Sequence, residues 1–466
     1  MSNQQNKKVI VLNVVALSPY MIGENTPNIN KLLANGYSKN NLSGEFPAVT
    51  TTAQSAMLTG KQAKDHGIVG NGWYFKDLAE VSFWKQANQL VQSDKVWDAL
   101  KRHNPQLKVS QLFWWYNMYA DVDNSITPRP HYLADGGKVF DLYSSPAGLH
   151  QQIEAEIGTF PFFSFWGPKA GIAASKWIAK AAIKEFQLNE PDLQLVYLPH
   201  LDYCLQKHGP DHASIGKEIA AIDAVVGDII DFHHDNNVDF VIVSEYGITQ
   251  VSETVHINKI LRQQGYIAVR DTLGFENLDC GASSAFAVAD HQCAHVYIND
   301  KDKLSEIRQL LQATKGIERV FDKTEQQKLG LNHDRSGDLV AISKADHWFS
   351  YYYWLDDKKA PDFARTVDIH RKPGYDPVEM FIDPNFKFPL LNVAYRLLKK
   401  KLGFRYLMDV IPLDCSLIKG SHGRLTDDAS LGPILIGPRQ HLLSEKNYKM
   451  TDVYDLILSM SQVKKS

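Results

Sequence analysis

The chain has 466 residues, of which 44% are hydrophobic, so it can bury a substantial core. This length exceeds what one compact core usually holds, and we therefore expect one main domain with an inserted subdomain. The formal net charge is −3, from 50 lysines and arginines against 53 aspartates and glutamates. This balance argues against nucleic acid as a bulk partner, because nucleic-acid binding normally needs a strongly basic surface.

The N-terminal region and the cysteines bear on the cellular compartment. The apolar stretch at residues 9–15 is too short for a membrane span and lacks the flanks of a signal sequence. Cys204, Cys280, Cys293 and Cys415 are scattered without a Cys-x-x-Cys pair, which indicates neither a disulfide scaffold nor a zinc knuckle. We expect a cytoplasmic protein with no membrane span.

Short β-branched runs alternate with longer helical patterns along the first part of the chain. Residues 8–15, 193–198 and 239–244 are apolar on both faces rather than in alternation, which is typical of parallel strands buried on both faces. Helical patterns occupy residues 26–35, 51–59, 173–186 and 215–233. The alternation predicts a doubly wound, mostly parallel α/β sheet, in which ligands bind beyond the carboxyl ends of the strands.

A second, smaller unit interrupts this pattern. Its predicted elements are a strand at 285–298, a helix at 303–313, and strands at 317–321 and 339–342. Their compact spacing predicts a small inserted α+β cap subdomain at about residues 266–345. The main core would then consist of a first part at residues 1–265 and a second part at residues 346–466.

The most informative segment lies at residues 46–60, where three threonines follow a proline. Thr50, Thr51 and Thr52 stand at the head of a predicted helix. The first turn of a helix offers unpaired N–H groups and the positive end of the helix dipole, and both favour an anionic ligand. A threonine hydroxyl at this point is placed to attack phosphorus or to hold a phosphate. The alternative is that the threonines only cap the helix, as they do at many helix starts.

Several short motifs resemble the alkaline phosphatase superfamily. Phe-Pro, the threonine helix, Leu-Thr-Gly and His-Gly-Ile follow one another within residues 46–68. This order is similar to the opening of the nucleotide pyrophosphatase/phosphodiesterase branch, to which phosphonoacetate hydrolase is related. The resemblance continues through residues 337–340 to residues 421–423. It implies an alkaline phosphatase-like core with an added cap.

The resemblance also implies roles for individual residues. Thr50 falls at the position of the family's nucleophile, and Asn71 at that of an asparagine that holds a phosphate oxygen. The family binds two metal ions through an aspartate after the first strand, Asp-x-x-x-His after the second, Asp-His after the third, and a late histidine. The matching positions in this sequence are Ala16, Asp202 with Gln206, Glu245 with Tyr246, and His422.

Three of the matched positions keep side chains that bind metal. We predict Asp202, Glu245 and His422 as ligands of a divalent ion, zinc by the resemblance, with one or two ions bound. The other matched positions carry no ordinary zinc ligand, since zinc favours cysteine, histidine and carboxylate donors. A normal two-zinc centre therefore cannot be assembled from the matched positions alone.

Residues outside the matched set are further candidates. His208 lies two positions after the expected histidine. The loop at residues 368–377 brings Asp368, His370 and Arg371 together, and arginine offers a planar, bidentate donor to phosphate. The alternative for this loop is an ordinary hydrogen-bonded turn.

Three other features are open to a structural or a functional interpretation. Asp290 and His291, in the predicted insertion, are a weaker metal candidate, and a hydrogen-bonded turn is the favoured interpretation. His200, beside Asp202, either orients that aspartate or is a structural histidine. The basic run at residues 399–401, preceded by paired leucines, is either a solvated helix end or a contact with a membrane surface.

Together these features predict a hydrolase of phosphoric esters or anhydrides, of the phosphodiesterase or nucleotide pyrophosphatase kind. Thr50 would attack phosphorus with metal assistance and form a phosphothreonine that water then hydrolyses. The expected partner is a phosphorylated small-molecule substrate. The alternatives are a catalytically silent relative that binds a phosphorylated metabolite or partner, and a single-metal hydrolase of a phosphonate or another phosphate ester.

Overall fold

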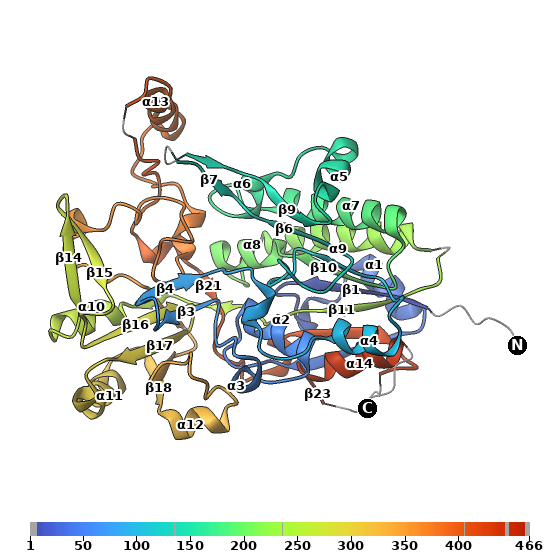
Figure 1. Ribbon diagram of the computed structural model, residues 1–466, viewed down its shortest axis with the longest axis horizontal. Helices are drawn as coiled ribbons and strands as arrows, with labels where there is room; N and C mark the ends of the chain where they lie inside the picture. Colours follow the sequence, from blue (N-terminus) through green and yellow to red (C-terminus); the bar gives the residue numbers. More distant parts are fainter. Residues whose placement is uncertain (1–6, 135–136, 235, 405, 443–446, 462–466) are drawn as a thin grey trace, which may run out of the picture.

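A nine-stranded sheet forms the centre of the molecule (Figure 1). The computed structural model describes residues 7–134, 137–234, 236–404, 406–442 and 447–461. In spatial order the strands are β23 (Tyr448–Lys449), β2 (Tyr37–Ser43), β22 (Ile434–Pro438), β11 (Val238–Val243), β1 (Lys8–Val14), β10 (Leu193–Leu198), β5 (Val109–Leu112), β6 (Asn124–Pro128) and β9 (Leu142–Ser145).

The middle of this sheet is parallel. β1 pairs in parallel with β10 on one side and β11 on the other, and β5 and β6 continue the parallel run. Antiparallel strands β22 and β9 follow at the two sides. The apolar runs of β1, β10 and β11 are buried almost throughout, which is what strands covered on both faces require. The predicted doubly wound α/β fold is confirmed.

Helices cover both faces of the sheet, in the layers seen in Figure 1. α1 (Pro27–Ala34), α7 (Ile172–Asn189), α8 (His200–His208) and α9 (Ile215–Phe232) pack together on one side. α2 (Thr50–Thr59), α4 (Val96–His103) and α14 (Asp452–Met460) pack together on the other. Within the described residues, none of the helices is both long and apolar enough to cross a membrane.

A second sheet of four antiparallel strands lies at one end of the molecule. Its order is β16 (Ala285–Asp290), β17 (Cys293–Ile298), β19 (Leu339–Ser343) and β18 (Ile317–Phe321), with α11 (Leu304–Ala313) against β18. The strand predicted at 285–298 is wrong in one respect, because it is a hairpin of two strands that turns at His291, whose φ is 60°. The continuous apolar run hid the turn, and only the polar triplet at 290–292 marks it.

The predicted insertion shares its core with the following segment. The buried cluster that contains Phe286 and Val296 also contains Trp348, Tyr351 and Trp354, which lie beyond the expected boundary. β13 (Glu253–Val255) pairs with β20 (His347–Phe349), which joins the two segments again. The boundaries at 266 and 345 therefore stay a prediction.

The remaining elements are short and lie around these two sheets. The helices are α3 (Ala63–His66), α5 (Leu149–Ile157), α6 (Phe162–Phe165), α10 (Ile257–Gln263), α12 (Lys323–Lys328) and α13 (Pro389–Lys401). The strands are β3 (Gly72–Phe75), β4 (Glu80–Phe83), β7 (His131–Tyr132), β8 (Lys138–Val139), β12 (Thr249–Gln250), β14 (Ala268–Thr272), β15 (Phe275–Asp279) and β21 (Gly420–Ser421).

Candidate functional site

The candidate site lies where the parallel strands end and α2 begins. β10 leads into α8, whose third residue is Asp202, and β11 is followed closely by Glu245 and Tyr246. His422 follows directly after β21. The fold thus brings residues from four distant stretches of the chain to the carboxyl edge of the sheet, as expected for an open α/β sheet.

Thr50 is the first residue of α2, and it does not cap that helix. The N-cap position is Val49, which supplies no side-chain hydrogen bond, so the capping alternative for the threonines is not what the structure shows. The Thr51 hydroxyl donates to the Gly70 carbonyl at 2.8 Å. Because Thr50 does not cap the helix, its hydroxyl is available for another partner. The residue is buried, with only 4% exposed.

The partner of Thr50 is Tyr246. The Thr50 Oγ1 atom lies 3.1 Å from the Tyr246 hydroxyl, which donates to Asp202 Oδ1 at 3.1 Å. Because a tyrosine hydroxyl has one proton and gives it to Asp202, the hydroxyl of Thr50 must donate to Tyr246. The three side chains form a continuous path for a proton from Thr50 to a carboxylate.

Asp202 is the acceptor at the end of this path. Its second oxygen accepts from Gln206 Nε2 at 2.8 Å, and Gln206 Oε1 in turn accepts from the Tyr375 hydroxyl at 2.9 Å. Burial raises the pKa of Asp202 to about 6, and the hydrogen bonds from Gln206 and Tyr246 oppose that shift. Asp202 is consequently ionised at neutral pH and protonated in mild acid.

Glu245 lies beside this path and is held by two amide side chains. Its Oε1 atom accepts from Asn13 Nδ2 at 2.6 Å and from Gln54 Nε2 at 2.7 Å, and the residue is fully buried. Burial raises the pKa of Glu245 to about 8, and the nearby charge of Asp202 adds to the shift. Glu245 therefore keeps its proton at neutral pH.

Asn71 is held by the turn of the β16–β17 hairpin. Asp290 accepts from the Asn71 backbone N–H at 2.8 Å and from its Nδ2 at 3.1 Å. Asn71 Oδ1 accepts from the Thr51 N–H at 3.0 Å, so Asn71 is fixed against the first turn of α2. The second sheet thereby contributes directly to the geometry at Thr50.

Four aromatic rings stack in a row behind Asp202. The ring of Tyr246 lies 3.6 Å from that of His422, His422 lies 3.7 Å from His291, and His291 lies 3.6 Å from Tyr375. Burial lowers the pKa of both histidines well below the ordinary value, so both rings are neutral. The stack makes a rigid, uncharged wall.

His422 points one unpaired nitrogen at Asp202. Its Nδ1 lies 2.7 Å from the Ala48 carbonyl, which only accepts, so Nδ1 carries the proton. The buried Nε2 has no hydrogen-bond partner and lies 3.6 Å from Asp202 Oδ1. This pair is the one feature of the site that a metal ion would fit directly.

The remaining donors do not complete the two-metal centre that the resemblance implies. Val15 and Ala16, which follow β1, have no donor side chain, and Tyr246 and Gln206 bond to Asp202 as neutral groups. Across the described residues, Asp202, Glu245 and His422 are not a group of closely spaced metal ligands. The residues present do not fit two metal ions, and the assignment of these three as ligands stays a prediction.

The further candidates lie elsewhere. His208 is the last residue of α8, where its ring stacks on His212 at 5.2 Å. Asp368 lies 3.7 Å from Lys138 of β8 and 3.4 Å from Arg371, and His370 packs against the ring of Tyr132 in β7. These contacts lie beside β7 and β8, and the assignment of Asp368, His370 and Arg371 to the site stays a prediction.

Sequence reasoning did not foresee several groups that shape the site. Asn13 is a polar residue inside an otherwise apolar strand, and such an interruption is the signal that could have marked it. Gln54 lies one turn after Thr50 on a helix that is buried on every side, where a polar side chain needs a partner. Tyr375 lies within the candidate loop at residues 368–377, but no local pattern indicated that its hydroxyl would donate to Gln206.

The chain is similar in sequence to one known family. The family model for type I phosphodiesterase / nucleotide pyrophosphatase matches residues 9–376, which is most of the chain. No match was found among curated proteins.

Solved structures of the same general fold were also found. Murine ectonucleotide pyrophosphatase/phosphodiesterase 5, an inactive threonine-to-alanine variant in complex with AMP, is 15% identical with a TM-score of 0.59, covering 98% of this chain and 96% of that one. The human protein is 15% identical with a TM-score of 0.60, covering 99% and 96%. Phosphonoacetate hydrolase from Sinorhizobium meliloti, in complex with phosphonoformate, is 14% identical with a TM-score of 0.61, covering 98% and 96%.

The protonated state of Glu245 predicts how stability depends on pH. Its pKa is raised from 4.5 to about 8, so the folded protein holds a proton that the unfolded chain releases. The stability from this proton is fully present below pH 4.5 and is lost as the pH rises through about 8, at roughly 1.4 kcal/mol per pH unit in between. Glu245→Gln should therefore raise the melting temperature by several degrees at pH 8 and change it little at pH 5.

Thermal unfolding with the exposed Glu253→Gln variant as control checks this expectation. A Glu245→Gln protein that melts lower than wild type only when zinc is supplied would show instead that Glu245 is a metal ligand.

Proposed function

Because the chain belongs to the type I phosphodiesterase / nucleotide pyrophosphatase family, whose members hydrolyse phosphoric esters and anhydrides, we propose that Thr50 is the nucleophile of such a reaction. One observation carries the proposal. The Thr50 hydroxyl begins a buried helix and donates, through Tyr246, to the carboxylate of Asp202. A threonine needs this kind of activation, because its hydroxyl is a poor nucleophile on its own.

The first step transfers a phosphoryl group to Thr50. As Oγ1 attacks phosphorus, the Thr50 proton passes to the Tyr246 oxygen and the Tyr246 proton passes to Asp202. The bond from phosphorus to the leaving oxygen breaks, the leaving group departs with the electron pair of that bond and takes any proton it needs from solvent, and the product is a phosphothreonine. Water then attacks phosphorus and the bond to Thr50 Oγ1 breaks. The proton on Asp202 returns along the same path to Oγ1, and the protons of the water stay on the phosphate product or pass to solvent.

The surroundings of Thr50 suit an anionic phosphoryl group. The N-terminal turn of α2 directs backbone N–H groups and the positive end of the helix dipole toward it. Glu245 is neutral at pH 7 because its pKa is raised to about 8, so it adds no repulsion. Its Oε2 has no hydrogen-bond partner and is free to donate to a phosphoryl oxygen when protonated.

Members of this family use divalent metal ions, and this chain departs from that pattern around Thr50. The hydrogen bonds of Tyr246 and Gln206 already satisfy both oxygens of Asp202. The mechanism above therefore uses only groups of this chain and has no step through a metal ion.

The substrate class follows from the family and from the neighbours' ligands. The murine relative binds AMP, and the phosphonoacetate hydrolase binds phosphonoformate, so both hold phosphorus oxyanions in this fold. We extend this to a phosphorylated small molecule with a phosphodiester or diphosphate-like bond. Thr50 is only 4% exposed, so side chains over it must move for the substrate to reach it.

A second candidate function is binding without turnover. The observation that favours it is that Asp202, Tyr246, Gln206 and Tyr375 satisfy one another by hydrogen bonds in a closed site. A silent relative would bind AMP or a similar phosphate and hydrolyse nothing. The variants below distinguish the two functions, because only turnover depends on the proton path.

Replacing the nucleophile should abolish turnover. Thr50→Ala is expected to lower kcat for bis(4-nitrophenyl) phosphate by at least about a thousandfold, because no other hydroxyl takes its place in the path. The fold should survive, since Thr50 is not the N-cap of α2. Thr52→Ala, two residues along the same buried helix, is the matched control and should stay close to wild type. Turnover that is equal in Thr50→Ala and wild type would remove Thr50 from the mechanism.

Breaking the path at Tyr246 should slow the reaction and keep the fold. Tyr246→Phe is expected to lower kcat by about 100-fold, the usual contribution of a positioned proton acceptor. In wild type, kcat should fall below about pH 6, where Asp202 takes up a proton and no longer accepts one. Tyr352→Phe is the control, because the hydroxyl of Tyr352 is buried like that of Tyr246 but has no hydrogen-bond partner. An unchanged kcat in Tyr246→Phe would contradict the path.

A further inference from the structure

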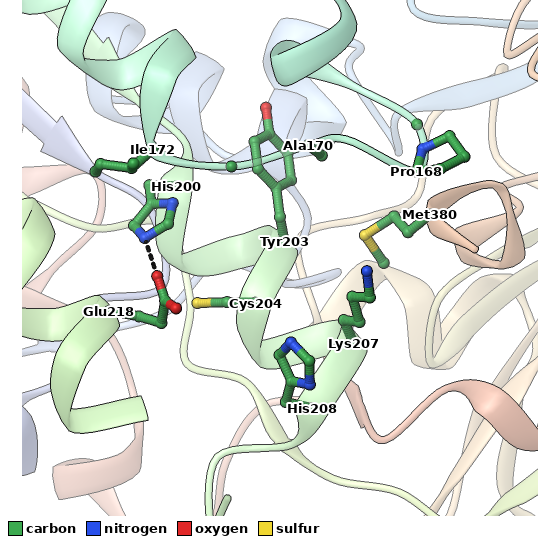
Figure 2. Close-up of a pocket in the computed structure, with 12 residues that line it drawn as sticks. Pro168, Ala170, Ile172, His200, Tyr203, Cys204, Lys207, His208, Glu218 and Met380 are labelled. Carbon is green, nitrogen blue, oxygen red and sulfur yellow. Dashed lines mark hydrogen bonds and ion pairs between the residues drawn. The ribbon is translucent and has the colours of Figure 1, made fainter. Parts of the chain in front are cut away.

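α8 presents a second set of chemically reactive side chains on its other face. Asp202 and Gln206 point to the Thr50 site, whereas His200 and Cys204, one helical turn apart, line a separate cavity (Figure 2). This cavity has a volume of about 170 Å³ and lies between α8, α9 and the segment at residues 167–172. Nothing in the mechanism proposed above uses it.

Three ligand atoms converge at this cavity. The Nε2 atom of His200 lies 2.8 Å from Glu218 Oε2, and the Cys204 sulfur belongs to the same group, in which all three atoms lie within 4.8 Å of one another. Figure 2 shows the sulfur and the imidazole directed toward the carboxylate. Over the part of the chain that the structure describes, this is the only such group of three. His200 and Cys204 are 3% and 8% exposed, so these are not scattered surface residues.

We propose that His200, Cys204 and Glu218 bind one zinc ion. Imidazole, thiolate and carboxylate are the donors that zinc selects, and three of them with an open fourth position is the arrangement of many zinc sites. Bond lengths of about 2.0 to 2.3 Å place tetrahedral ligands about 3.5 Å apart, so only small side-chain movements are needed. Thiolate and carboxylate together balance the charge of the ion.

Binding must displace hydrogen bonds that the three groups now make. The Cys204 thiol donates to the Leu201 carbonyl at 3.3 Å, and its proton leaves to solvent when zinc takes the sulfur. The Nε2 atom of His200 exchanges its contact with Glu218 for the metal, and the proton of the neutral ring is then on the buried Nδ1, which has no hydrogen-bond partner in this arrangement.

The cavity also provides the fourth position. Its volume exceeds the roughly 30 Å³ of one water molecule several times, so a water or a small anion can complete the coordination. His208, a further turn along α8, lines the same cavity and is the nearest additional imidazole. The zinc would tie α8 to α9 and so hold the helix that carries Asp202. This site rests on no part of the proposed hydrolytic function.

The test is metal binding by the full chain, with zinc and cobalt ions alone as probes. After treatment with a chelator, the protein should bind one zinc per chain in competition with a chromophoric chelator. Cobalt should give the near-ultraviolet absorption of a cobalt–thiolate bond, which separates this site from the Thr50 site, because the side chains described there include no cysteine. Cys204→Ser should lose that absorption and weaken zinc binding by at least about 100-fold.

Three controls decide the assignment. Cys280→Ser, another buried cysteine, and Asp202→Asn should both keep the cobalt–thiolate absorption. Glu218→Gln should weaken zinc binding without removing the absorption, and this guards against a folding defect in Cys204→Ser. Wild-type protein without the absorption, or a Cys204→Ser protein that retains it, would overturn the site and leave His200 and Glu218 as a hydrogen-bonded pair between α8 and α9.

A second inference rests on α13, which extends away from the body of the molecule (Figure 1). None of its residues is buried; Val393 packs against the second core cluster, whereas most of the leucines of the helix are exposed. The exposed fraction is 83% for Leu390, 66% for Leu391 and 53% for Leu398, and it is 63% for Phe404 just beyond the helix. So many exposed large apolar side chains on one short element mark an interaction surface.

The charges around α13 indicate what covers it. Residues 387–404 contain four lysines and one arginine and no aspartate or glutamate, and because Arg396 forms an ion pair with Asp409 at 2.6 Å, the excess positive charge comes from the lysines. At 13 residues the helix is about 20 Å long, too short to span a bilayer of about 30 Å. We infer that α13 lies in the surface of an anionic membrane, with its leucines among the acyl chains and its lysines at the headgroups.

Vesicle sedimentation of the full chain tests this inference. Vesicles of phosphatidylcholine with phosphatidylglycerol should bind the protein, and phosphatidylcholine alone should bind it at least about tenfold more weakly. Leu390→Asp combined with Leu398→Asp should remove binding. Leu78→Asp is the control, because Leu78 is 64% exposed elsewhere on the surface, and it should leave binding unchanged.

Two results would overturn the inference. The first is wild-type protein that binds neither kind of vesicle. The second is a wild-type dimer that the double variant converts to monomer, since α13 would then contact a second copy of the chain.

Discussion

The buried carboxylate of Asp202 is the group on which the rest of the candidate site depends. An isolated charge in this position would cost several kcal/mol, and the structure avoids that cost with hydrogen bonds from Tyr246 and Gln206. Those two donors fix the stack of rings and the direction of the Thr50 hydroxyl. A carboxylate held by neutral donors remains a proton acceptor, whereas a carboxylate bound to zinc does not. Tyr246 and Gln206, which stand where the resemblance implies histidine ligands, weaken a metal centre and at the same time hydrogen-bond Asp202 as a proton acceptor.

The two faces of α8 connect this site to the rest of the molecule. One face supplies Asp202 and Gln206 to the Thr50 site, and the other supplies His200 and Cys204 to the cavity beside α9. Residues four apart in a helix share a face, whereas residues two apart face opposite ways, because the helix turns by about 100° per residue. A ligand that orders one face of this short, buried helix therefore constrains the other.

The fold and part of the site could be predicted from the sequence for definable reasons. The strands β1 and β10 are apolar on both faces, with few polar interruptions, and this pattern is typical of strands covered on both sides. Thr50, Asn71, Asp202 and His422 lie in short motifs whose order resembles that of a known family. The hairpin at His291 escaped prediction because an apolar strand pair and a single long strand have the same composition.

The sequence by itself determined the sheet, the helices on its two faces and the loss of several family ligands at its edge, because these follow from local patterns and matched motifs. Only the tertiary structure decided what those replacements do. It joined Thr50 to Asp202 through Tyr246, brought Asp290 to Asn71, and placed Glu245 between two amides where it keeps a proton. These contacts link residues roughly 40 to 230 positions apart, and hydrogen bonding and burial at such separations depend on the folded chain rather than on any local sequence.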